Sequence, residues 1–104
     1  MTSSSSDMSA AEGGASLTRE LPIINKRGLH ARASAKFVQL VEKYDAQVLV
    51  TRNGETVGGT SIMGLMMLAA GIGTSITVST SGNQAQDVLD ALTELLANKF
   101  GEEE

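Results

Sequence analysis

The chain has 104 residues, one histidine, no cysteine and a formal net charge of −4. Its length allows one modest hydrophobic core, so we expect one small domain. The lack of cysteine excludes disulfides and a thiolate nucleophile, and with one histidine we expect neither a metal site nor a cofactor. Apolar runs are too short to span a bilayer and the N-terminus does not look like a signal peptide, which predicts a cytoplasmic protein without a membrane partner.

The N-terminal segment, residues 1–16, consists almost entirely of Ser, Ala, Gly, Thr and acidic residues. Such a composition buries too little apolar surface to offset the entropy of ordering, so we expect a disordered tail followed by a domain over residues 17–104. The first strand is predicted over residues 17–24, where Leu17, Leu21 and Ile23 share one parity. Pro22 lacks a backbone donor and therefore favours an edge position for this strand.

A loop over residues 25–28 precedes a predicted amphipathic helix of about three turns. Gly28 gives this loop its backbone freedom just before the histidine. Basic and polar residues recur on one side of the helix, and apolar residues at helical spacing occupy the other. The apolar residues are Ala33, Phe37, Leu40, Val41 and Tyr44.

The second half of the chain predicts a hairpin, a short helix, a strand and a last helix. Asn53-Gly54 separates strands over residues 47–52 and 55–58. Thr60 or Ser61 caps a methionine-rich helix that runs to about Ala70 and is ended by Gly71 and Gly73. A strand over residues 75–80 leads to Ser81-Gly82-Asn83, which should turn the chain and cap the last helix. This order favours an α+β fold with one antiparallel sheet and helices on one face.

The segment Gly28-Leu29-His30-Ala31-Arg32 places the histidine where a loop becomes a helix. A neutral imidazole can act as a nucleophile without a separate base. Phosphate on this ring would be stabilised by backbone N–H groups of the first helical turn and by Arg32. Half of the basic residues lie close by, and no acidic residue occurs from position 21 to 41. The acidic residues elsewhere, including Glu102-Glu103-Glu104, we expect to form a solvated helix face and a tail.

Spacing alone leaves the role of this segment open. A histidine that merely caps a helix, beside a solvated basic face, explains the same residues at least as well.

Together with Ser61-Ile62-Met63-Gly64, this segment resembles the HPr phosphocarrier family of the bacterial phosphotransferase system, over about residues 17–100. The resemblance implies an open-faced sandwich, in which an antiparallel sheet of strand order 1-4-2-3 is covered on one face by three helices. It also implies a phosphoryl carrier, not an enzyme. His30 would accept the phosphoryl group from Enzyme I as a pros-phosphohistidine and pass it to a IIA protein. Arg32 would be its charge partner, and Gly28 and Ala31 would form the surrounding loop. Ala33 stands where the family more often has proline.

The resemblance also implies a docking face and a regulatory site. The docking face would combine apolar residues of the second helix with the loop before His30; its expected members are Lys26, Arg27, Leu29, Ile62, Met63 and Met66. Ser61 matches a serine that a dedicated HPr kinase phosphorylates in some members, although it also fits an ordinary N-cap. We expect a monomer that does not bind nucleic acid, because the chain lacks aromatic residues for stacking on bases.

Two alternatives stay open within this interpretation. The first is a regulatory adaptor of the same fold in which His30 never carries phosphate. The second concerns the pathway, because neither motif separates sugar transport from the nitrogen-related branch of the phosphotransferase system.

Overall fold

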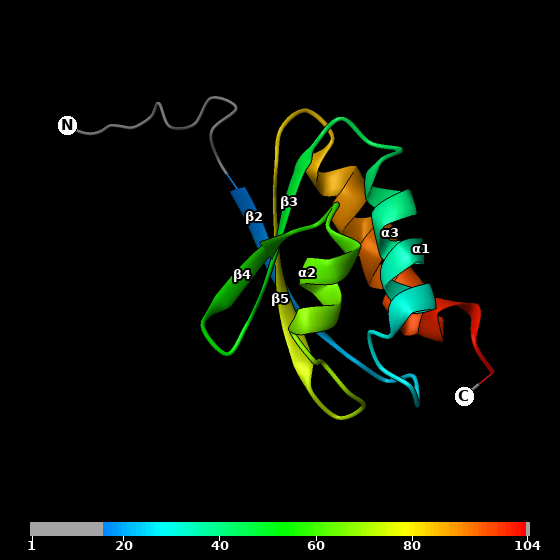
Figure 1. The fold of residues 1–104 in the computed structure, drawn as a ribbon. Helices are drawn as coiled ribbons and strands as arrows, with labels where there is room; N and C mark the ends of the chain where they lie inside the picture. Colours follow the sequence, from blue (N-terminus) through cyan, green and yellow to red (C-terminus); the bar gives the residue numbers. More distant parts are fainter. Residues whose placement is uncertain (1–15, 104) are drawn as a thin grey trace.

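The computed structural model describes residues 16–103, which form one antiparallel sheet and three helices (Figure 1). The strand order is β2-β5-β3-β4, so the first and fourth strands of the chain are neighbours and β2 lies at an edge. The predicted α+β fold with strand order 1-4-2-3 is therefore confirmed, as is the edge position that Pro22 required. The elements are β2 (Ser16–Pro22), α1 (Ala31–Val41), β3 (Gln47–Arg52), β4 (Glu55–Gly58), α2 (Ile62–Met67), β5 (Ser75–Ser81), α3 (Ala85–Ala97) and the 3₁₀ turn η2 (Lys99–Gly101).

The helices pack on one face of the sheet because its strands alternate in burial. Val48 and Val50 of β3 point into the core, as do Ile76 and Val78 of β5, while their neighbours along each strand are more exposed. The hairpin between β3 and β4 turns at Asn53-Gly54 with positive φ at both residues, as its sequence predicted. Among residues 16–103, no helix covers the opposite face of the sheet.

The boundaries of the sequence-based domains need one small correction. Ser16 pairs with Ser81 at the start of β2, so the ordered domain begins one residue earlier than expected. The rest of the predicted disordered tail, residues 1–15, lies outside the described residues.

Helix α2 is shorter than the sequence indicated. Ser61 is its N-cap, as expected, and accepts a hydrogen bond from the Gly64 N–H at 2.9 Å. The helix ends at Met67 instead of near Ala70 because Ala69 adopts a left-handed conformation with φ 54°. A guanidinium N–H of Arg52 donates to the carbonyl of Leu68 at 2.9 Å and so satisfies an acceptor at the end of the helix.

The expected cap of α3 is wrong. Asn83 does not cap this helix; its side-chain amide donates to the Asp45 carboxylate at 2.9 Å, and the N-cap residue is Gln84. Gln84 also accepts a hydrogen bond from the backbone N–H of Asp45 at 2.7 Å. This turn therefore ties the start of α3 to the connection between α1 and β3, an interaction that local sequence does not reveal.

After α3 the chain turns back toward the start of α1 (Figure 1). Three consecutive residues, Lys99, Phe100 and Gly101, have φ between 56° and 80°. The Phe100 ring is 1% exposed within the core, and its carbonyl accepts a hydrogen bond from the Lys36 ammonium of α1 at 2.6 Å. Left-handed conformations of non-glycine residues are unfavourable. The burial of Phe100 must therefore offset their free-energy cost and stabilise the turn of the chain back toward α1.

Candidate functional site

His30 lies where the loop after β2 meets α1, and it is the N-cap residue of that helix. Its backbone is extended and its carbonyl accepts the first helical hydrogen bond, from Ser34 at 2.9 Å. His30 thus occupies the cap position that the alternative interpretation gave it, but its ring makes no capping hydrogen bond. The N–H groups of the first turn therefore remain available at this end of the helix.

The loop before His30 is fixed against the segment that follows α2. The backbone N–H of Leu29 donates to the Ala70 carbonyl at 3.0 Å, and Gly28 adopts φ 67° beside it. A Cβ atom at position 28 would lie only 2.5 Å from that carbonyl oxygen. Gly28 is thus needed both for its left-handed conformation and for its close approach to Ala70.

Leu29 does not belong to the exposed docking face that the resemblance implied. Its side chain is 5% exposed and packs in the core. The Ser34 hydroxyl donates to the Leu29 carbonyl at 3.2 Å. Leu29 therefore supports the histidine loop from beneath, since burying its side chain stabilises the loop more than exposing it would.

The partner of the His30 ring is Glu102, which lies 72 residues away in the sequence. The Glu102 carboxylate is hydrogen-bonded through Oε2 to the ring Nε2, and through Oε1 it accepts from the Asn25 side-chain amide at 3.0 Å. The same Asn25 amide donates to the Gly28 carbonyl at 2.9 Å. The expectation that residues 102–104 form a solvated tail is therefore wrong for Glu102, whose side chain is only 17% exposed.

The charges around Glu102 keep it ionised. Although burial raises its pKa, the hydrogen bonds from Asn25 and His30 and the positive charges of His30 and Arg27 lower the pKa of Glu102 below its ordinary value of 4.5. One ring nitrogen of His30 is therefore hydrogen-bonded to an ionised carboxylate, although the charged residues near His30 in the sequence are all basic. The carboxylate, held by a buried asparagine, could not be found from spacing because nothing in the sequence relates positions 25, 30 and 102.

Arg27 and Arg32, together with Glu102 and Glu103, line a hollow of about 290 Å³ beside the histidine. Arg32 is exposed on the first turn of α1 and has no hydrogen bond or ion pair within residues 16–103. Lys26 is exposed in the same loop. The structure thus brings the expected basic residues near His30 and adds two carboxylates to them. No group of side chains in this described range could hold a metal ion.

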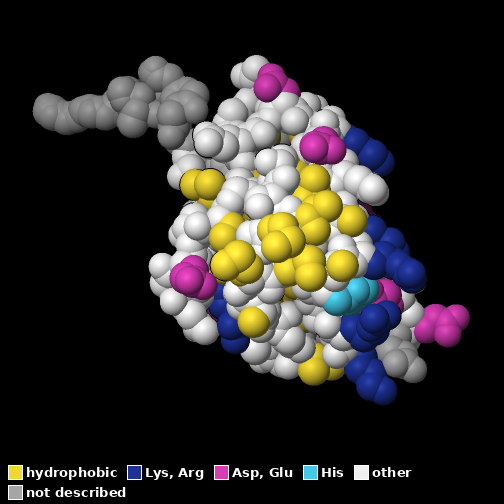
Figure 2. Space-filling model, viewed as in Figure 1, with side chains coloured by type: hydrophobic (Ala, Val, Ile, Leu, Met, Phe, Trp, Pro, Cys, Tyr) yellow, Lys and Arg dark blue, Asp and Glu magenta, His cyan; other side chains and the backbone are white. Residues whose placement is uncertain are grey.

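Next to the histidine, α2 presents an exposed apolar surface, which we call the methionine patch (Figure 2). Its members are Ile62, Met63, Met66 and Met67. Leu65 and Leu68 face the core instead and are at most 3% exposed. Met67 is 71% exposed, which the sequence does not reveal because a helix without polar residues has no polar face from which its orientation can be deduced. Figure 2 shows the patch directly beside the histidine. Lys and Arg side chains lie next to the histidine on the side away from the patch.

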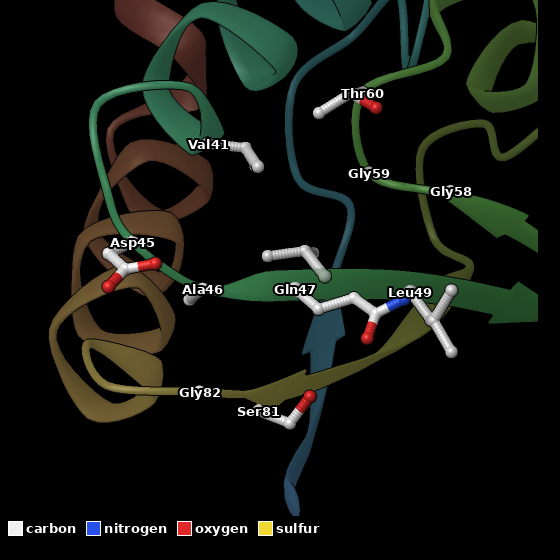
Figure 3. Close-up of a pocket in the computed structure, with 11 residues that line it drawn as sticks. Val41, Asp45, Ala46, Gln47, Leu49, Gly58, Gly59, Thr60, Ser81 and Gly82 are labelled. Atoms are coloured by element: carbon white, nitrogen blue, oxygen red, sulfur yellow. The ribbon is translucent and has the colours of Figure 1, made fainter.

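A larger hollow, of about 650 Å³, lies elsewhere (Figure 3). It is bounded by Val41, at the opposite end of α1 from His30, by the start of β3, and by the last residues of β4 and β5 with the residues that follow them. The 11 residues of α1 separate the two places by about 16 Å. Glycines and short side chains line much of this hollow, and Asp45 is the only charged residue among the described residues that line it. It is separate from the histidine site.

In the described part of the chain, every helix is too short or too polar to cross a membrane.

Comparisons with known proteins agree with this geometry. Residues 17–98 match the family described as "PTS HPr component phosphorylation site". The chain is 56% identical over 88 residues to the phosphocarrier protein HPr of Cupriavidus necator, covering 85% of this chain and 99% of that one. It is 55% identical over 86 residues to HPr of Pseudomonas aeruginosa, covering 82% and 96%. The crystal structure of HPr from Thermoanaerobacter tengcongensis superposes with a TM-score of 0.80 at 38% identity, covering 85% and 99%. The chain therefore belongs to the HPr family of phosphocarrier proteins of the phosphotransferase system.

Proposed function

We propose that His30 is the phosphoryl acceptor, that Enzyme I is the donor and that a IIA protein receives the group. The nucleophile is Nδ1, the pros nitrogen. Its lone pair forms the new N–P bond while the bond from phosphorus to the donor breaks and leaves its electron pair on the donor. The reverse sequence at the acceptor returns the histidine unchanged, so the protein acts as a carrier.

The observation that carries this proposal is the position of His30 beside the methionine patch, at a helix N-terminus with uncapped N–H groups. Arg32 on the first turn adds a guanidinium group that can pair with phosphate oxygens. Phosphoryl transfer needs mainly positioning and charge neutralisation, both of which these groups supply without a metal. Gly28 and Ala31 form the backbone on either side.

Docking is assigned to the methionine patch together with Lys26 and Arg27. Unbranched methionine side chains adapt to different partner shapes, which suits a carrier that uses one face for a donor and for an acceptor. The patch is small, so complexes should form weakly and release quickly. We assign the carrier to the cytoplasm as a monomer, since the same face must be free for each partner in turn.

Incubation with phosphoenolpyruvate and Enzyme I tests the acceptor. The protein should take up one phosphoryl group that is labile in acid and stable in base, and His30→Ala should take up none. A wild-type protein that stays unlabelled, or a His30→Ala variant that is labelled normally, would refute the assignment and favour the adaptor that binds partners without carrying phosphate.

The branch of the phosphotransferase system is decided by the acceptor. Labelled protein mixed separately with a sugar-permease IIA domain and a nitrogen-type IIA protein should lose its phosphoryl group much faster to its physiological acceptor. Faster transfer to the sugar-permease domain assigns transport, and faster transfer to the nitrogen-type protein assigns regulation.

A further inference from the structure

The Glu102 carboxylate is hydrogen-bonded to one of the two ring nitrogens of His30, the proposed phosphoryl acceptor. Because an ionised carboxylate can only accept a hydrogen bond, Nε2 of His30 must carry the proton that it shares with Oε2. A neutral imidazole has one N–H, so Nδ1 is then the nitrogen with the free lone pair. The contact therefore determines which nitrogen of His30 can act as a nucleophile.

Asn25 fixes the orientation of this carboxylate. Its side chain is fully buried, and its amide donates both to the Gly28 carbonyl and to Oε1 of Glu102. With two acceptors on that side, the amide nitrogen and oxygen of Asn25 cannot be exchanged. Oε1 is thus directed at Asn25 and Oε2 at the histidine ring.

The return of the chain after α3 holds Glu102 in place from the other side. Phe100, two residues earlier, is buried in the core and bound through its carbonyl to Lys36. The segment that carries the carboxylate is therefore held in place by the burial of Phe100 and by its hydrogen bond to Lys36. Glu103, the next residue, is exposed and forms no such contact within the described residues.

We propose that Glu102 is a positioning residue for phosphoryl transfer, which holds His30 in the Nε2–H tautomer and balances the positive charge of the ring once Nδ1 is phosphorylated. The inference rests on the carrier function proposed above. When Nδ1 attacks, the Nε2 proton stays in place and the ring becomes an imidazolium. Its charge faces the Glu102 carboxylate, in the same way that a buried aspartate supports the imidazolium of a Ser-His-Asp triad. When the phosphoryl group leaves, the ring is neutral again with the same proton, so the cycle needs no separate base.

Glu102→Gln gives a sharp test because Asn25 selects the orientation of the new amide. The glutamine oxygen must accept from the Asn25 amide, which turns the glutamine NH₂ toward Nε2 of His30. Nε2 then becomes an acceptor and the proton moves to Nδ1. Glu102→Ala removes both groups and should leave a mixture of tautomers. Glu42→Gln removes the same charge at an exposed residue that follows α1 at the end opposite His30, and it serves as the matched control.

The first measurement is ¹⁵N NMR of the His30 ring in the unphosphorylated protein, recorded at a pH above the range in which the ring signals shift with pH. Wild type and Glu42→Gln should show the Nε2–H tautomer, and Glu102→Gln should reduce the ratio of Nε2–H to Nδ1–H at least about tenfold. The second is the rate of phosphoryl uptake from charged Enzyme I, which should fall about tenfold in Glu102→Gln and stay within about twofold of wild type in Glu42→Gln.

Either measurement can overturn the proposal. Unchanged tautomers in Glu102→Gln would show that the carboxylate does not select the nitrogen. Uptake by Glu102→Gln at or above the wild-type rate would make Glu102 a competitor of the phosphate instead. If wild type took up no phosphoryl group at all, the carrier function would fail, whereas the tautomer of the unphosphorylated ring would still show whether Glu102 positions it.

Discussion

At the scale of single residues, His30 contacts a carboxylate and lies near guanidinium groups, to which we assign different parts of the proposed reaction. Glu102 contacts a ring nitrogen, whereas Arg32 is exposed and has no partner within residues 16–103, so its charge is available to an incoming phosphoryl group. This separation gives the two residues distinguishable effects on rate and on stability.

Replacing Arg32 with alanine should slow phosphoryl uptake about tenfold, because a charge-assisted contact to the phosphate is lost. The free energy of unfolding should change by roughly 0.5 kcal/mol or less, since the Arg32 side chain is exposed. The rate is measured in reactions with charged Enzyme I that are quenched at set times. The control is Lys43→Ala, which removes the same charge beyond the other end of α1. Equal slowing in both variants would reduce the role of Arg32 to general attraction of the donor.

Glu102 should make the stability depend on pH. Its pKa in the folded protein is lowered despite the burial that raises it, because Asn25 and His30 donate to it and His30 and Arg27 attract it. A carboxylate with a depressed folded pKa contributes stability that is present above its ordinary value of 4.5 and is lost as the pH falls through the lowered value. The difference in melting temperature between wild type and Glu102→Gln should therefore shrink from about pH 5.5 to about pH 3. Circular dichroism measures it, and a constant difference would contradict this reasoning.

At the scale of elements, the loop before α1 and the segment after α2 are joined by one backbone contact. The Leu29 N–H binds the Ala70 carbonyl, and Gly28 lies against the same oxygen. The histidine and the methionine patch are therefore held in one arrangement, although a hairpin and a helix separate them in sequence. The left-handed Ala69, which ends α2 early, turns the chain into this contact.

Gly28→Ala should destabilise the protein by about 3 kcal/mol, because a Cβ atom at φ 67° is strained and would lie 2.5 Å from the Ala70 oxygen. Gly71→Ala is the control, since a Cβ atom there meets nothing within 4 Å and its φ is not left-handed. Urea unfolding gives both values. Equal effects of the two substitutions would mean that the contact with Ala70 is not what requires glycine at position 28.

Two substitutions of Ser61 can distinguish its structural role as a helix cap from a regulatory effect of negative charge on docking. Ser61→Ala loses the hydrogen bond from Gly64 and should cost about 1 kcal/mol in unfolding, whereas Ser61→Asp keeps an acceptor at the N-cap and should retain stability. The aspartate should nevertheless weaken docking to Enzyme I, since it adds a negative charge next to the methionine patch. Titrations followed by NMR measure the affinity. Weaker docking of the alanine variant than of the aspartate variant would point to helix stability, not charge.

At the scale of the whole molecule, the site is assembled from three separate segments on the helical side of the sheet. The loop over residues 25–30 supplies the histidine, α2 supplies the patch, and the return after α3 supplies Glu102. The sheet brings the first and last of these together because β2 and β5 are neighbours and α3 follows β5 directly. The open face of the sheet takes no part.

Met63→Asp should therefore weaken binding of Enzyme I by at least about tenfold, because it places a charge in the middle of an apolar docking surface. Met63 is 69% exposed, so the fold should tolerate the change. Leu49→Asp, at an exposed apolar position on the other face of the sheet, should leave the affinity unchanged. A comparable loss in the Leu49 variant would place the docking surface on the sheet.

The sequence by itself determined the fold class, the strand order through its family resemblance, and the identity of the two motifs. The alternation in β3 and β5, the Asn53-Gly54 turn and the Ser61 cap are local patterns whose consequences can be calculated from neighbouring residues. Only the tertiary structure decided that Leu29 is buried, that α2 ends at Met67, and that Glu102 contacts His30. The physical reason is range: these features depend on contacts with the segment around Ala70 and on the return after α3, and periodicity along the chain carries no information about contacts between positions so far apart.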